Sequence, residues 1–117
     1  MTRIEVSTYT ALIYVGGPLA DAMVTARGYC DAVGLCVTVE PVSFIYTGGT
    51  TDGVRVGLIN YGRFPSEPDA IFAHAERLAV MLIDDLGQES ASIVATDRTV
   101  WLSNRPAKPA STNTEGA

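Results

Sequence analysis

The sequence predicts a single α+β domain in the order strand, helix, strand, strand, helix, strand. Two amphipathic segments with apolar residues three and four positions apart are each bounded by residues that start and stop helices. Between them lie two segments rich in β-branched and aromatic residues, joined by the glycine-rich turn 47–53, which is typical of a hairpin. Further strand-like segments precede the first helix and follow the second.

The predicted helices run from Pro18 to Gly34 and from Ser66 to Gly87. Pro18 suits a first helical position, and Gly34 suits the left-handed residue after a helix. Ser66 followed by Asp69 resembles a capping box. The predicted strands are 8–15, 35–46, 54–61 and 91–96, with a short further strand at 99–102. The apolar spacing predicts a buried stripe of Leu19, Met23, Ala26, Cys30 and Val33 in the first helix, and of Ile71, Phe72, Ala75, Leu78, Ala79, Leu82, Ile83 and Leu86 in the second.

This element order is the split βαβ, or ferredoxin-like, order. It predicts an antiparallel sheet with both helices on one face, because both crossovers are right-handed. Trp101 would lie in the extra C-terminal strand. We expect one domain over residues 1–103 and a disordered tail over 104–117, which is polar and punctuated by prolines. The order alone does not indicate a function, since it supports many unrelated activities.

Composition excludes several classes of function. The net charge is −5 and the isoelectric point is near 4.6, so nucleic acid is an unlikely partner. The N-terminus has no apolar signal core, and no apolar run approaches the roughly 18 residues of a membrane helix. We therefore expect a cytoplasmic protein without a membrane partner. Cys30 and Cys36 are interpreted as small core residues rather than a disulfide.

The sequence offers few catalytic side chains. His74 is the only histidine, and its position at the flank of the apolar arc favours a structural role. No zinc-ligand spacing and no Gly-x-Ser-x-Gly motif occurs. We therefore predict no catalytic residue, metal or cofactor, and the interpretation leans away from an enzyme. A small enzyme that uses His74 or a carboxylate in a buried pocket is the alternative.

The predicted ligand-binding residues lie in two segments. Asn60, Tyr61, Arg63 and Phe64 combine an amide, two aromatic rings and a guanidinium before the second helix, a set suited to stacking and to anion binding. Gly16 and Gly17 place backbone amides before the first helix, where anions bind readily. The alternative is that Tyr61 and Phe64 only pack the helix onto the sheet, and that the two glycines only form a tight turn.

Four segments resemble small, uncharacterised proteins of bacteriophages and prophages: Tyr14-Val-Gly-Gly-Pro-Leu19, Gly34-Leu-Cys-Val-Thr-Val39, Tyr46-Thr-Gly-Gly49 and Gly57-Leu-Ile-Asn-Tyr61. The segment Gly87-Gln-Glu-Ser90 is similar to uncharacterised ferredoxin-like families. The first resemblance implies a phage accessory protein that acts by binding, in the cytoplasm of the host cell.

Three hypotheses of function follow. The first is a non-catalytic accessory binding protein that sequesters a small anionic, nucleotide-like ligand or blocks a host defence protein. The second is the small enzyme described above, and the third is an assembly module. We also expect a homodimer or a higher homo-oligomer, because the first three strands carry apolar residues on both faces.

Overall fold

The computed structural model describes residues 1–105. Within them the elements are β1 Thr10–Gly16, α1 Leu19–Val33, β2 Thr38–Tyr46, β3 Gly49–Ile59, α2 Pro68–Asp85, β4 Ser90–Ala95 and β5 Thr99–Ser103. Of the predicted disordered tail, residues 106–117 lie outside the described part of the chain. Asn104 still follows the sheet, since its backbone N–H donates to the carbonyl of Glu89 at 2.8 Å.

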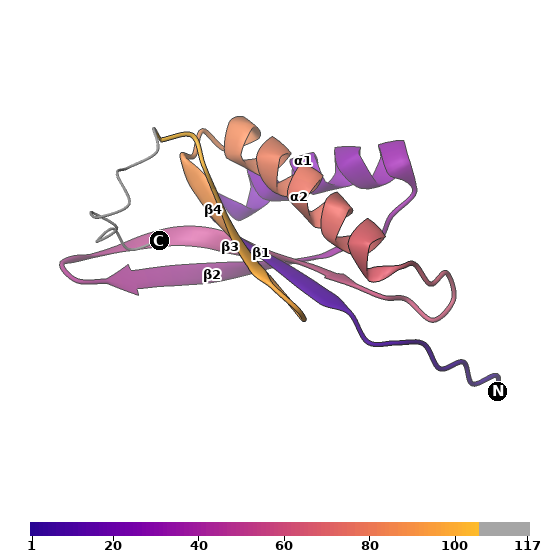
Figure 1. Cartoon of the computed structure of the whole chain (residues 1–117). Helices are drawn as coiled ribbons and strands as arrows, with labels where there is room; N and C mark the ends of the chain where they lie inside the picture. Colours follow the sequence, from indigo (N-terminus) through magenta and orange to yellow (C-terminus); the bar gives the residue numbers. More distant parts are fainter. Residues whose placement is uncertain (106–117) are drawn as a thin grey trace.

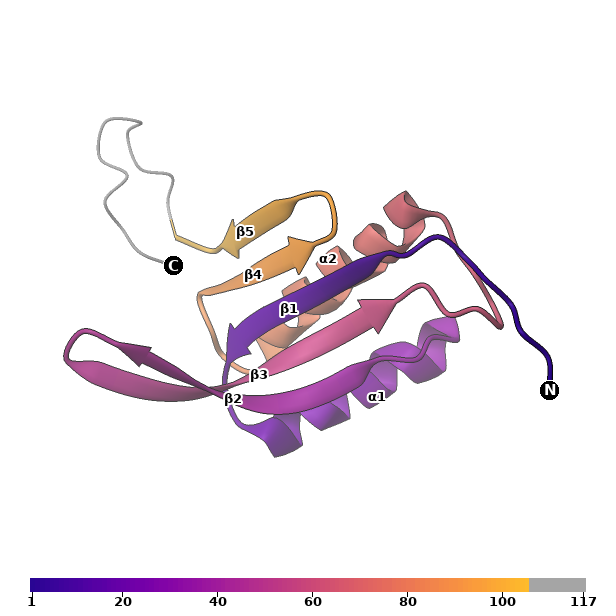
Figure 2. The same ribbon diagram turned by 90° about the horizontal axis from the view of Figure 1, so that it is seen from below.

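The strands form one antiparallel sheet in the order β2-β3-β1-β4-β5. The central strand β1 pairs with β3 on one side and with β4 on the other. Figures 1 and 2 show both helices on the same face of this sheet. The predicted α+β ferredoxin-like fold, with its short extra C-terminal strand, is therefore confirmed. We call the sheet face without helices the open face.

Alternation along the strands divides the side chains between the core and the open face. Ala11, Ile13 and Val15 of β1 are at most 1% exposed and face the helices. Leu12 and Tyr14, between them in the sequence, are partly exposed on the open face. The same alternation buries a larger set of residues from the neighbouring strands: Val54, Val56, Leu58, Ala91 and Ile93.

The buried face of α1 differs from the predicted stripe. The buried residues are Ala22, Thr25, Ala26 and Tyr29, whereas Met23 and Val33 are 54% and 43% exposed. The helix is rotated toward α2 because its polar groups find partners there. The hydroxyl of Thr25 donates to Asp85 at 2.7 Å. The helix begins at Leu19, one residue later than predicted, with Pro18 as its N-cap, and it ends as predicted at Gly34, which adopts the left-handed conformation.

The helix α2 buries the predicted arc from Ile71 to Ile83, but Leu86, the last predicted member, follows the helix end and is only partly buried. Its start, however, is two residues later than predicted, and the predicted capping box is wrong. The N-cap is Glu67, which makes no side-chain cap, and Pro68 occupies the first turn. Ser66 cannot cap this later start, and its N–H instead donates to the side-chain oxygen of Asn60.

The β2–β3 hairpin is longer than predicted. The sequence placed the start of the third strand at Val54, but β3 begins at Gly49, directly after a turn at Thr47 and Gly48. Gly48 has a positive φ of 83°, which permits this short turn. The extra residues pair in register from Ser43↔Asp52 to Tyr46↔Gly49. The hairpin therefore extends past the core, as Figure 2 shows, and forms one wall of the groove described next.

Candidate functional site

The largest hollow that we describe is a groove of about 810 Å³ at the hairpin end of the sheet. It lies between the extended β2–β3 hairpin and the segment that joins α2 to β4, and β5 closes its far side. Its aromatic lining residues are Tyr14, Phe44, Tyr46 and Trp101. Its main polar lining residues are Thr51, Gln88, Glu89, Ser90, Ser92 and Arg105.

Strand register brings these side chains together from distant parts of the sequence. Tyr14 of β1 pairs with Ser92 of β4, which pairs with Trp101 of β5. Paired residues of antiparallel strands point to the same face, so these three form a row across the open face. Arg55 continues the row on the other side of Tyr14, and its guanidinium donates to the Glu40 carboxylate at 2.9 Å.

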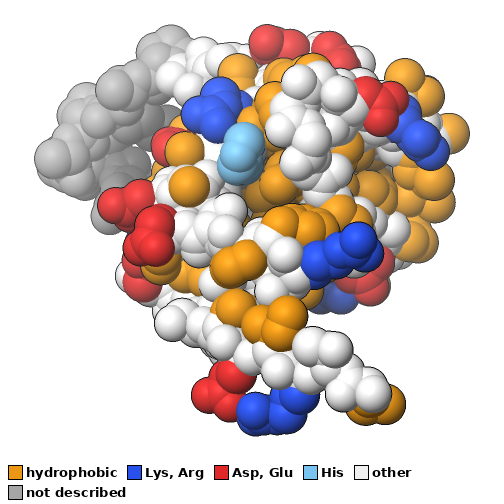
Figure 3. Space-filling view, turned by 90° about the vertical axis from the view of Figure 1, so that its right-hand side faces the viewer, with side chains coloured by type: hydrophobic (Ala, Val, Ile, Leu, Met, Phe, Trp, Pro, Cys, Tyr) orange, Lys and Arg blue, Asp and Glu red, His pale blue; other side chains and the backbone are white. Residues whose placement is uncertain are grey.

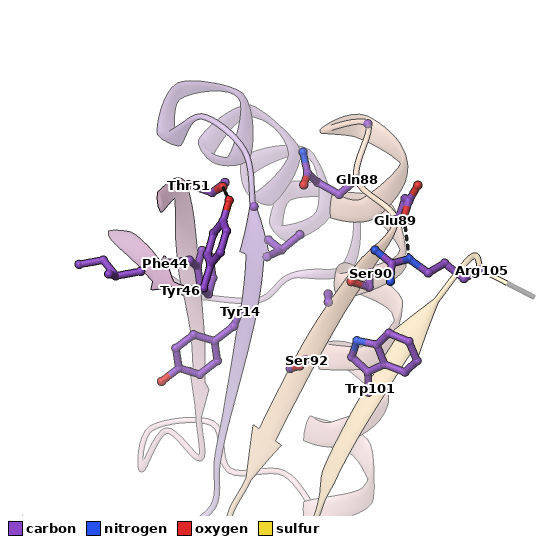
Figure 4. Close-up of a pocket in the computed structure, with 15 residues that line it drawn as sticks. Tyr14, Phe44, Tyr46, Thr51, Gln88, Glu89, Ser90, Ser92, Trp101 and Arg105 are labelled. Carbon is purple, nitrogen blue, oxygen red and sulfur yellow. Dashed lines mark hydrogen bonds and ion pairs between the residues drawn. The ribbon is translucent and has the colours of Figure 1, made fainter. Parts of the chain in front are cut away.

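The aromatic residues of the hairpin are held by local contacts. The hydroxyl groups of Tyr46 and Thr51 are hydrogen-bonded at 3.0 Å. Phe44 lies over Gly53, where an added Cβ would come within 2.3 Å of its ring. Figure 4 shows Phe44, Tyr46 and Tyr14 on one side of the groove and Trp101 on the other. The groove therefore presents aromatic surfaces from two opposing walls.

One ion pair lies at the rim of the groove. The guanidinium Nε of Arg105 donates to the carboxylate of Glu89 at 2.7 Å, and both side chains are about half exposed to solvent, at 46% and 67%. Because exposed ion pairs contribute only about 0 to 1 kcal/mol, a polar ligand can replace this contact at little cost. The groove thus offers a positive and a negative group beside aromatic rings.

The two predicted glycines differ in position and availability. Gly16 lines the groove, where an added Cβ would come within 2.6 Å of the Gln88 side chain. Gly17 does not line the groove. Its φ is 122°, and its N–H donates to the carbonyl of Asp52 at 3.1 Å. That N–H is therefore already used within the fold.

The other four predicted residues lie at the opposite end of the sheet, which Figure 3 views from outside. Asn60 has partners on both sides, because its amide donates to the carbonyl of Ser7 at 2.8 Å and its oxygen accepts the N–H of Ser66 at 2.9 Å. Tyr61 and Phe64 pack together with their ring centroids 5.2 Å apart. Arg63 is exposed and makes no hydrogen bond or ion pair with residues 1–105.

A smaller cavity of about 210 Å³ lies beneath this loop, lined in part by Cys36, Tyr61 and His74. The pKa of Tyr61 is raised to about 12, mainly by interaction with the Cys36 thiol and to a smaller extent by burial. His74 joins the two helices, since its Nδ1 lies 2.7 Å from the Tyr29 hydroxyl and 3.2 Å from Arg77. Burial and the Arg77 charge lower the pKa of His74. Because arginine can only donate, Nδ1 must accept, so this contact needs a neutral imidazole.

Two general features of residues 1–105 bear on function. They contain no cluster of three His, Cys, Asp or Glu side chains that could hold a metal ion. Neither of the two helices in this part of the chain has the length and apolar character needed to cross a membrane.

Solved structures supply the comparison with known proteins. No family model and no curated protein matches the chain. A phage SAM lyase in its apo state matches with a TM-score of 0.70 and 18% identity, over 92% of this chain and 98% of that one. A phage SAM lyase in complex with S-methyl-5'-thioadenosine matches with a TM-score of 0.62 and 17% identity, over 88% and 95% of the two chains. The fold is therefore shared with phage proteins.

These matches overturn the main functional hypothesis from the sequence. A non-catalytic binding protein is contradicted, because both matched proteins are lyases, which are enzymes. The alternative of a small ferredoxin-like enzyme agrees better with them. The sequence argument gave too much weight to the absence of familiar catalytic motifs. Apart from Gly16, it also overlooked the residues that line the groove. The only sequence signal for them was the alternation that sets Trp101 on the face opposite Val100 and Leu102.

Proposed function

We propose that this protein is an enzyme that cleaves S-adenosylmethionine (SAM) without water, and that the groove at the hairpin end binds the substrate. The observation that carries this proposal is the presence of facing aromatic walls and a Glu89–Arg105 pair in one groove. The match to phage SAM lyases over 92% of the chain supports it. The groove volume of about 810 Å³ lies within the range of about 300 to 1,000 Å³ usual for small-molecule sites.

The groove has a feature suited to each part of SAM. Aromatic rings stack on the adenine and attract the sulfonium cation through their faces. Arg105 can bind the substrate carboxylate in a bidentate manner, and Glu89 can bind the ammonium group. In this arrangement the substrate exchanges the ion pair between Glu89 and Arg105 for one new ion pair with each of them.

The reaction can proceed without a general base. The substrate's own carboxylate oxygen attacks the γ-carbon of the aminobutyrate chain, and the bond from that carbon to sulfur breaks. The electron pair of this bond stays on sulfur, so the products are neutral S-methyl-5'-thioadenosine and homoserine lactone. No proton is transferred. The protein's part is to hold the carboxylate against the γ-carbon, which is catalysis by proximity and orientation. This chemistry is compatible with the scarcity of catalytic side chains in the sequence.

Product analysis tests the proposal. We expect the protein to convert SAM to S-methyl-5'-thioadenosine and the lactone faster than a blank without protein, as measured by liquid chromatography and mass spectrometry. In water enriched in heavy oxygen, the lactone formed at early times should carry no label. Labelled homoserine as the first product would indicate hydrolysis, and SAM that decays only at the blank rate would contradict the proposal.

We further propose that the protein self-associates through the open face. Ile59, Val94 and Trp101 are 49%, 40% and 45% exposed there, beside Leu12 and Tyr14. An apolar face of this kind commonly packs against another subunit. Sedimentation should give a multiple of the 12.4 kDa chain mass, and a monomer at micromolar concentration would contradict this proposal.

We also propose that the enzyme acts in the cytoplasm, which is that of the host cell if a phage encodes the protein.

Self-association gives the sequence-predicted loop a role. The groove and the Asn60–Phe64 segment lie at opposite ends of the sheet, so one chain cannot join them. A second copy packed in the reverse direction across the open face would bring its loop to the first copy's groove. We propose that Arg63 of that second copy adds positive charge near the substrate carboxylate, with Tyr61 and Phe64 beside it.

Mixing two variants tests this shared site. Arg63→Ala and Arg105→Ala should each be weakly active alone. Unfolded and refolded together in equal amounts as dimers, they should recover about a quarter of the wild-type rate, since half of the dimers are mixed and each has one intact site of two. A mixture that is no more active than the average of the two variants would place both arginines, or Arg105 alone, in a site formed by one chain.

A further inference from the structure

The two cysteines lie on either side of the point where α1 ends and the chain turns toward β2. Cys30 lies in the last turn of α1, and its carbonyl accepts the N–H groups of both Gly34 and Leu35, at 2.8 and 3.2 Å. Gly34 has φ 73° and ψ 62°, so the chain reverses at this point. Cys36 is the second residue after the reversal. The chain therefore returns past the helical turn that carries Cys30.

Both cysteines line one cavity. This cavity of about 370 Å³ is lined by Cys30 and Cys36 together with Arg27, Val37 and other residues of α1 and the β2 approach. Cys36 is exposed and Cys30 is partly buried. Arg27 is exposed and makes no ion pair with the described residues, and its charge favours a thiolate here, whereas the charge of Asp31, which also lines the cavity, opposes one.

We propose that Cys30 and Cys36 form a redox modification site in which a peroxide converts the two thiols into an intramolecular disulfide. The site is separate from the groove and does not depend on the proposed SAM chemistry. It revises the interpretation of both cysteines as core residues, because Cys36 is exposed. Of the two, Cys36 is the one a soluble oxidant reaches first.

The reaction has two steps. The Cys36 sulfur attacks one oxygen of hydrogen peroxide, the O–O bond breaks, and Cys36 becomes a sulfenic acid with release of one water. The Cys30 sulfur then attacks the Cys36 sulfur and displaces its hydroxide, which takes the Cys30 proton and leaves as a second water. Two thiols lose two electrons in total, and the peroxide is reduced. Burial and the neighbouring Cys36 raise the pKa of Cys30, which suits it to the second step rather than the first.

Oxidation of the cysteines should change the pKa of Tyr61, which lies in the loop before α2. Tyr61 and Cys36 line the same small cavity beneath this loop, and Cys36 is the main cause of the raised pKa of Tyr61, which is about 12. A disulfide cannot ionise, so its formation removes the two sulfurs whose negative charges oppose that of the tyrosinate. Oxidation should therefore lower the pKa of Tyr61 toward the ordinary tyrosine value of about 10. The cysteine pair thus gives an optical signal as well as a mass change.

The full-length protein is treated with peroxide, digested with trypsin and analysed by mass spectrometry to test the proposal. Trypsin leaves both cysteines on one peptide, Gly28–Arg55, because no lysine or arginine lies between Arg27 and Arg55. After one equivalent of hydrogen peroxide, we expect this peptide to lose the mass of two hydrogens and to stop reacting with iodoacetamide. Dithiothreitol should restore both thiols. In an alkaline absorbance titration, oxidation should move one tyrosine to lower pH, and the Tyr61→Phe variant should lack that change.

The serine variants distinguish the two steps. In Cys30→Ser, Cys36 should stop at a sulfenic acid that dimedone traps, whereas in Cys36→Ser, Cys30 should react much more slowly. Two results would overturn the proposal: a wild-type peptide that keeps both thiols under these conditions, or cysteine oxidation found only as disulfides between chains.

Discussion

The two ends of the sheet show how differently similar residue types can be used. At the loop end, Asn60 is hydrogen-bonded to the backbone of Ser7 and Ser66. The rings of Tyr61 and Phe64 pack together, and His74 contacts Tyr29 and Arg77. At the hairpin end, aromatic rings face each other across an open groove, and an exposed ion pair stands at its rim. The first end stabilises the fold, and the second has surfaces left for a ligand.

The difference lies in partners rather than in residue type. Asn60 satisfies its donor and its acceptor within the chain, so a ligand would have to break two hydrogen bonds to use it. Arg105 and Glu89 form an exposed ion pair with each other, and a zwitterionic ligand can replace that pair. We therefore expect changes at the hairpin end to affect activity. At the loop end, we expect changes at residues whose polar groups are occupied within the chain, such as Asn60, to affect mainly stability, whereas the exposed Arg63 should affect activity.

The largest effect is expected for Arg105→Ala. Loss of a charged hydrogen bond to the substrate carboxylate should lower kcat/KM for SAM cleavage by about 10- to 100-fold, corresponding to roughly 1.5 to 3 kcal/mol. Thermal unfolding should change little, because the pair with Glu89 is exposed. Arg27→Ala, another exposed arginine but outside the groove, is the matched control and should leave kcat/KM unchanged. If kcat/KM falls equally in Arg105→Ala and Arg27→Ala, the groove is not the substrate site.

A smaller effect, on stability, is expected for Asn60→Ala. The variant loses two hydrogen bonds that join the N-terminal segment to the loop before α2, at a cost of about 1 to 2 kcal/mol in the free energy of unfolding. Asn60→Asp keeps the acceptor for Ser66 and should lose only part of this. Urea unfolding measures both. If Asn60→Ala is as stable as the wild type but binds SAM more weakly, Asn60 contacts the ligand and its proposed structural role is wrong.

The smallest effect is expected for the titration of His74. Its pKa is lowered in the folded protein, so the unfolded chain binds the proton more tightly. The contribution of His74 to stability is therefore complete above the unfolded pKa of about 6.5, and falls as the pH drops through that value toward the folded pKa. Urea unfolding at pH 8 and at successively lower pH should show this loss in the wild type. His74→Gln, which keeps an acceptor for the Tyr29 hydroxyl, should lack that part of the pH dependence.

Local rules explain why the sequence predicted the fold well. Pro18 and Gly34 bound α1, and the apolar spacing of α2 gives its buried arc, because each signal lies within a few residues of what it determines. The buried face of α1 was misjudged, since it depends on a partner such as Asp85 that is sixty positions away. Strand order followed from the element order and the handedness of crossovers.

The groove could not be predicted in the same way. Its wall depends on the row Tyr14, Ser92 and Trp101, which exists only once β1, β4 and β5 pair in one register. Arg105 was assigned to the tail because the composition becomes polar after Ser103, and nothing local indicates its contact with Glu89. Conversely, Asn60 has the residue type of a ligand contact, and its sequence position does not reveal that both of its polar groups are occupied.

The central claim is that the groove binds SAM and cleaves it, and the most direct test is turnover by the wild-type chain beside Arg105→Ala at equal concentration. We expect S-methyl-5'-thioadenosine and unlabelled homoserine lactone to form in equal amounts with the wild-type protein, and at least about tenfold more slowly with the variant at low substrate concentration. If circular dichroism shows that both proteins are folded and SAM decays in both samples only as fast as in the blank, the proposed enzyme function is wrong.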